Sequence, residues 1–214
     1  MRAVPAGGAR GAGAGLMAGF SAPYSVGESI AQYLRNTYPD DLRNDHPCRF
    51  ELAKSEDFAS ADTFTETTIT LFLYRMTIDQ YLHPAGAQRV APPSSRALPL
   101  DLHYMLTVWT DNKHAEHLLM AWVMAQLHWN PVLDSSNLMR LGGWRADETI
   151  QITPTSITQE DLSRIWDVME PSYRLSTTYV ARVVHIDPPP ETAHPPVVAS
   201  RFETSRLESA EAGS

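Results

Sequence analysis

Residues 98–109, LPLDLHYMLTVW, constrain the fold more than any other segment of the chain. Large apolar side chains occupy every second position from Leu98 to Val108, and successive residues of a β-strand point to opposite faces of a sheet. The alternation therefore predicts a strand with one apolar face, which needs a layer of helices to cover it. Asp101 and His103 fall on the other face, which we expect to be polar and half-exposed.

The remaining segments predict an α/β (α+β) fold in which about three helices flank a mixed β-sheet. Ser25 and Glu28 have the spacing of a capping box, which predicts the start of a helix that ends before Pro39. We expect Asp111 or Asn112 to cap a second helix and Thr158, with Asp161, to cap a third. Four further segments have strand character: 48–52, 67–78, 148–153 and 175–186.

Glycine and proline divide the chain into one domain with two tails. Six of the eleven glycines lie in the first nineteen residues, so residues 1–20 are expected to be a flexible Gly/Ala-rich arm, unless Met17 is the initiator. Five of the sixteen prolines lie in the segment DPPPETAHPP, which favours an extended or disordered C-terminal tail over residues 188–214. Residues 21–187 are then the single folded domain.

Charge and cysteine content exclude several classes of protein. The formal net charge of −8 argues against a protein that binds nucleic acid across its surface, because such binding needs clustered Lys and Arg. The lone Cys48 excludes an internal disulfide and multi-cysteine metal sites. No segment approaches the roughly 18 consecutive apolar residues of a membrane-spanning helix. We expect a soluble, cytoplasmic protein that contacts neither nucleic acid nor membrane.

No set of residues predicts catalysis, a cofactor or a metal. His114 and His117 are three residues apart on the second helix, but a zinc site needs a third ligand, so we interpret them as surface residues. Asp101 and His103 lack a Ser or Cys nucleophile placed by a motif. Cys48 is expected to be a small buried apolar side chain. The prediction is a non-enzymatic protein that binds or assembles with other proteins.

Five short motifs together resemble one protein family. That family contains the cap, or tail-terminator, proteins of extracellular contractile injection systems, which are phage-tail-like particles that include antifeeding prophages, and it was long labelled a domain of unknown function. The resemblance covers about residues 22–187 and departs from the family pattern at residues 79–83 and 120–122. Its motifs are Leu73-Tyr74-Arg75, Pro99-Leu100-Asp101-Leu102-His103-Tyr104, Pro131-Val132-Leu133, Ile165-Trp166 and Tyr173-Arg174-Leu175-Ser176.

The resemblance implies a tail-terminator-like fold and a structural role. A protein of this family is expected to form a six-membered ring that closes the distal end of the inner tube and sheath. It would stop polymerisation and couple tube to sheath, in particles that assemble in the cytoplasm and either stay there or leave by lysis. Its partners would be itself, the tube protein and the sheath protein.

Two sets of residues are singled out for this role. The irregular loop 83–97 carries two arginines on an otherwise acidic chain and is a candidate contact surface. The candidate interface residues are Arg89, Arg96, Tyr173 and Arg174. The residues that carry the family motifs are Tyr74, Arg75, Asp101, His103, Tyr104 and Trp166.

Two other functions remain open at this stage. One is a stand-alone small-ligand-binding or regulatory α/β domain that uses the face of Asp101 and His103 as a pocket. The other is a hydrolase that uses the same two residues. A monomer that binds a metabolite would indicate the first, and a substrate whose hydrolysis requires Asp101 would indicate the second.

The tail generates one prediction. From Asp187 to the last residue it carries five acidic residues and two arginines, a net charge of −3. If it docks on a basic surface of tube or sheath, a chain truncated after Asp187 will bind more weakly, and the loss will be largest at low salt, where charges are least screened. Binding to purified tube and sheath across a salt series measures this. Equal affinity with and without the tail would exclude docking by the tail.

Overall fold

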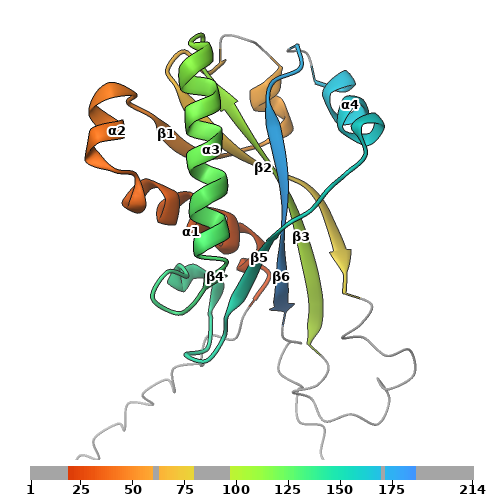
Figure 1. Cartoon of the computed structure of the whole chain (residues 1–214). Helices are drawn as coiled ribbons and strands as arrows, with labels where there is room; N and C mark the ends of the chain where they lie inside the picture. Colours follow the sequence, from red (N-terminus) through yellow and green to blue (C-terminus); the bar gives the residue numbers. More distant parts are fainter. Residues whose placement is uncertain (1–18, 60–62, 80–96, 170–171, 187–214) are drawn as a thin grey trace, which may run out of the picture.

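A six-stranded mixed sheet forms the centre of the protein (Figure 1). The computed structural model describes residues 19–59, 63–79, 97–169 and 172–186. The fold class predicted from the sequence is confirmed, with four α-helices in the described part of the chain. The strands are β1 (Arg49–Ala53), β2 (Thr68–Ile78), β3 (Leu98–Trp109), β4 (Val132–Leu133), β5 (Ile150–Pro154) and β6 (Ser176–Ile186).

The strand β3 lies inside the sheet. Its second face is half-exposed at Asp101 and His103, as predicted, but it is buried from Met105 to Trp109, which the alternation did not predict. The strand order is β1-β2-β3-β6-β5-β4, so β1 and β4 are the two edges. Strand β1 runs parallel to β2, whereas every other pair is antiparallel. The register shifts between Leu73 and Arg75 on β2 and between Leu100 and Leu102 on β3. Such irregularities increase the local twist of a sheet.

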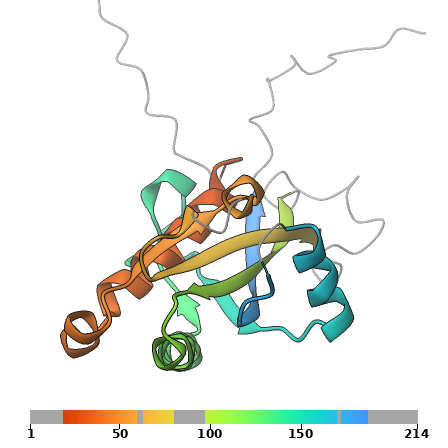
Figure 2. The same cartoon turned by 90° about the horizontal axis from the view of Figure 1, so that it is seen from above.

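Helices cover both faces of the sheet. The helices are α1 (Ala22–Thr37), α2 (Asp40–Asp45), α3 (Lys113–Trp129) and α4 (Gln159–Asp167), with short 3₁₀ turns η1 (Ser55–Phe58) and η5 (Arg140–Gly142). Side chains of α1 and α3 form the main core with the apolar face of β3. On the opposite face, η1 and α4 pack against Met105 and Trp109 of the same strand. The view from above shows α4 at a distance from α1 and α3 (Figure 2).

The predicted capping box at Ser25 and Glu28 is wrong. Helix α1 begins at Ala22, with Pro23 in its first turn, and Ser25 lies buried inside the helix. The Ser25 hydroxyl donates to the Met139 carbonyl at 2.9 Å and accepts from the Trp144 indole at 3.0 Å. A proline at the first helical position is preorganised for a helix start, and the serine instead ties α1 to the segment around η5.

The caps predicted for the other two helices are confirmed. The Asn112 side chain accepts from the backbone amides of His114 and Ala115 at the start of α3. The Thr158 hydroxyl accepts from the Asp161 amide at 3.1 Å at the start of α4. These bonds satisfy amides that the first helical turn leaves without partners.

Several short elements have no counterpart among the predictions, namely α2, η1, β4 and η5. Each spans six residues or fewer, too few to show a periodicity. The predicted N-terminal arm and C-terminal tail fall almost wholly on residues 1–18 and 187–214, which lie outside the described residues.

Two methionines on α3 test the assignment of its buried face. Met120 is 5% exposed and Met124 is 45% exposed. Met120→Ala should lower the free energy of unfolding by about 2–5 kcal/mol, because it leaves a cavity in the core. Met124→Ala, the matched control, should change it by less than about 0.5 kcal/mol. Urea unfolding followed by circular dichroism measures both, and equal losses would contradict the orientation of α3.

Candidate functional site

Five polar side chains gather on one face of β2 and β3, next to α4. Arg75 lies opposite His103, and Thr77 lies opposite Asp101, in the register of the two strands. The Thr77 hydroxyl and His103 Nε2 are 3.0 Å apart, and the rings of His103 and Tyr74 are 6.0 Å apart. We call Tyr74, Arg75, Thr77, Asp101 and His103 the polar sheet face. Four of the predicted motif residues therefore gather in one place.

Burial shifts both titratable groups at the centre of the polar sheet face toward neutrality. The Asp101 Oδ1 atom is buried and has no hydrogen-bond partner among the described residues. Burial, followed by the charge of Asp79, raises the pKa of Asp101, and Arg182 partly opposes this. Burial, followed by the charge of Arg75, lowers the pKa of His103. The arrangement disfavours charge on both groups and pairs His103 with a hydroxyl of a neighbouring strand.

Tyr173 and Arg174 lie near the start of β6, at the end of the sheet where β3 leads into α3. The Arg174 guanidinium donates to the Thr110 carbonyl at 3.2 Å, and its carbon lies 5.7 Å from the centre of the Trp109 ring. The Tyr173 ring is exposed and lies 5.9 Å from that of Trp166. Arg174 also borders a polar cavity of about 580 Å³. The other two predicted interface residues, Arg89 and Arg96, lie outside the described residues.

Two of the motif residues are structural. Tyr104 is 1% exposed in the main core, and its hydroxyl donates to the Pro23 carbonyl at 3.1 Å, which holds the start of α1 against β3. Trp166 is 4% exposed and packs in the second cluster with Trp109. Packing in the two apolar clusters therefore accounts for these two motif residues.

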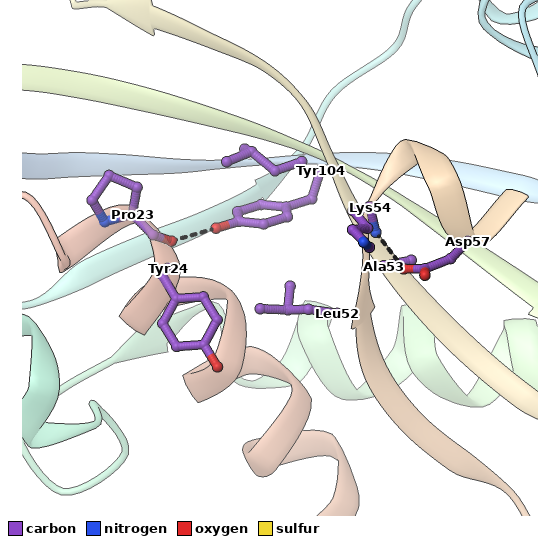
Figure 3. Close-up of a pocket in the computed structure, with 8 residues that line it drawn as sticks. Pro23, Tyr24, Leu52, Ala53, Lys54, Asp57 and Tyr104 are labelled. Atoms are coloured by element: carbon purple, nitrogen blue, oxygen red, sulfur yellow. Dashed lines mark hydrogen bonds between the residues drawn. The ribbon is translucent and has the colours of Figure 1, made fainter.

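An apolar pocket of about 470 Å³ lies between the start of α1 and the end of β1 (Figure 3). Gly27 allows α1 to approach β1 closely, because a Cβ atom there would meet the Leu52 side chain at 2.6 Å. The Lys54 amide donates to Asp57 Oδ2 at 2.8 Å on one side of the opening, and Tyr24 stands on the other. The lining residues are Pro23, Tyr24, Leu52, Ala53, Lys54, Asp57, Leu73 and Tyr104. No local pattern predicts this pocket, since its walls are distant in sequence.

The remaining chemical candidates have ordinary surroundings. Burial raises the pKa of the Cys48 thiol to about 12, so the thiol is protonated and weakly nucleophilic near neutral pH. The His46 and His114 rings are 5.8 Å apart. In the described ranges, three or more potential metal ligands nowhere gather into a site. None of the described helices is long and apolar enough to span a membrane.

The buried carboxylate of Asp101 predicts a pH-dependent stability. Because its folded pKa lies above the ordinary value of 3.8, ionisation in the folded state costs stability as the pH rises through the folded pKa. Asp101→Asn should therefore be more stable than the wild type at pH 7, and this advantage should vanish below the ordinary pKa. Denaturant unfolding at a series of pH values measures the difference. Asp111→Asn, at an exposed position, is the control and should show no such trend.

Comparison with known proteins relates the chain to one family. The family described as the Pvc16 N-terminal domain matches residues 25–200. No curated protein matches. The chain is similar to the PVC sheath/tube terminator of an extracellular contractile injection system in its extended state, with 22% identity and a TM-score of 0.47, over 87% of this chain and 65% of that one. It is also similar to the tube-terminating cap of the anti-feeding prophage, with 18% identity and a TM-score of 0.46, over 79% and 60%.

The chain thus spans less than two thirds of either solved protein. The family match covers most of the chain and all six strands of the sheet, and it begins within the first turn of α1. The family predicted from the five motifs is confirmed, and the chain belongs to the Pvc16 N-terminal domain family.

Proposed function

We propose that this protein is a subunit of the cap that terminates the tube and sheath of a contractile injection system. Membership of the Pvc16 N-terminal domain family is the observation that carries the proposal. In this role the subunits form a closed ring of six at the distal end of the particle. The ring stops polymerisation and couples the inner tube to the sheath. Assembly takes place in the cytoplasm.

Exposed apolar side chains on the folded domain support an assembly role. Eight large apolar side chains of the described residues are at least half exposed, and an exposed apolar surface of appreciable size marks a site of association. They are Phe20, Tyr24, Met76, Ile78, Trp129, Leu141, Val168 and Tyr173. A ring subunit needs such surfaces, because it buries them against its neighbours and against the end of the tube.

The proposed role is structural and involves no turnover. The polar sheet face supports this, because it is the strongest catalytic candidate among the described residues and its geometry does not suit catalysis. His103 is paired with the Thr77 hydroxyl, and burial raises the pKa of Asp101, which disfavours its charged form. A general base needs a group poised to accept a proton from a bound substrate. Neither residue lines any of the three cavities described for this structure.

Particle length provides the test. Particles assembled without this protein should have tubes of irregular length with open distal ends, because nothing stops polymerisation. Electron microscopy of particles from a strain that lacks the gene, and from the same strain carrying the gene on a plasmid, measures the length distribution. Asp101→Asn supplied on the plasmid should restore normal length. Normal lengths and closed ends in the deletion strain would refute the proposal.

A further inference from the structure

One edge of the sheet carries an apolar hollow that continues along β2. The pocket floor includes Leu73, which lies opposite Tyr104 in the register of β2 and β3. Farther along the same face of β2, Met76 is 56% exposed and Ile78 is 52% exposed, although their cross-strand partners on β3 are buried. Tyr24 stands at the rim, 54% exposed. Within the described ranges, no helix covers the apolar face of this half of β2.

The other edge of the sheet carries a projecting aromatic side chain. Trp129 is the last residue of α3 and is 69% exposed. It is followed closely by β4, the opposite edge strand, on which Val132 is 47% exposed. A tryptophan can bury 150–250 Å² of surface, roughly, and is enriched among the residues that dominate binding energy at interfaces. Leaving it in water on a folded monomer is unfavourable.

We propose that the Trp129 side chain of one subunit inserts into the hollow between α1 and β1 of a second copy of this chain. This inference rests on the proposed function and names the contact that closes the ring. The hollow, of about 470 Å³, is large enough to accept an indole ring. Val132 extends the contact along Met76 and Ile78.

The placement of the two surfaces favours a second copy as the occupant. A ring is built from heterologous contacts, in which each subunit presents two different patches on different sides. The hollow lies beside β1 and the tryptophan beside β4, the two ends of the strand order. In the view from above, the start of α1 lies apart from α3 (Figure 2), although both helices pack on the same face of β3.

Charge also favours this pairing. Each chain carries a net charge of −8, so two copies repel unless they meet through surfaces with little charge. His128 and Asn130, which flank Trp129, carry no formal charge when histidine is neutral. At the hollow, Lys54 is paired with Glu56, and Asp57 accepts from the Lys54 amide. The tryptophan patch therefore brings no formal charge into the contact, and at the hollow the Lys54 ammonium offsets the charge of Glu56.

Cross-linking in assembled particles tests the contact directly. In a Cys48→Ser background, Asn130→Cys combined with Tyr24→Cys leaves Trp129 and the floor of the hollow intact. A short bifunctional thiol cross-linker should then link chains into a ladder that ends at the size of the closed ring. Each single-cysteine variant should give at most a dimer. Capped particles without the ladder would overturn the contact while leaving the proposed function standing, whereas absence of the protein from particle ends would refute the proposed function itself.

Complementation between two variants tests whether the contact is head-to-tail, with the tryptophan of one chain in the hollow of the next. Trp129→Ala should raise the dissociation constant between subunits by about 30-fold or more, as expected for a dominant interface residue. Leu73→Trp should do the same by filling the hollow with its own indole, and Tyr24→Glu provides a second, exposed variant. Val168→Ala, at an exposed position on neither patch, should associate like the wild type.

Mixing the variants separates the possible occupants of the hollow. A mixture of Trp129→Ala and Leu73→Trp chains retains one intact tryptophan and one intact hollow, so it should form dimers that grow no further. Analytical ultracentrifugation detects them. Wild-type association by Trp129→Ala would overturn the proposal. Full association of the Leu73→Trp chain with the wild-type chain at both patches would also overturn it. That result would mean that the N-terminal residues of the same chain or a small ligand, and not Trp129, fill the hollow.

Discussion

The fold depends on one strand that is buried on both of its faces. From Leu102 to Trp109 every side chain of β3 except that of His103 is buried, and alternate residues enter two separate apolar clusters. Such a strand is stable only if helices cover both sides, since each face removes apolar surface from water at about 25 cal/mol per Å². Helices α1 and α3 provide one layer, and η1 and α4 provide the other. The sheet order then sets which strands remain at the edges.

The helices on the two faces of the sheet cover it unequally, so each face keeps an exposed region of its own. Tyr104 and Ser25 attach the start of α1 to β3 and to the segment around η5, so α1 stops short of the far half of β2. The apolar hollow is the gap left beside it. On the other face, α4 ends above the polar sheet face, where His103 and Thr77 satisfy one another. One uncovered region is therefore apolar and the other polar, on opposite sides of the same strands.

Sequence patterns predicted the elements whose signal is local and long. The alternation of residues 98–109 and the caps at Asn112 and Thr158 act within a few residues, so they are readable without a structure. The capping box predicted at Ser25 was wrong because the Ser25 hydroxyl has two partners that are distant in sequence, which a local pattern cannot show. Strand β4 is defined only by its pairing with β5. The hollow joins residues from Pro23 to Tyr104, and Trp129 continues an apolar helix, so neither surface stands out before folding.

The position of β6 inside the sheet determines when the sheet of a newly made chain can be completed. Residues 176–186 are the last described element of the chain, yet they lie between β3 and β5 and join the two halves of the sheet. Pairings between segments so far apart in sequence form late, because the intervening chain must first be ordered. During synthesis the N-terminal elements emerge first, and they lack this strand. A chain that lacks this strand thus has no continuous sheet.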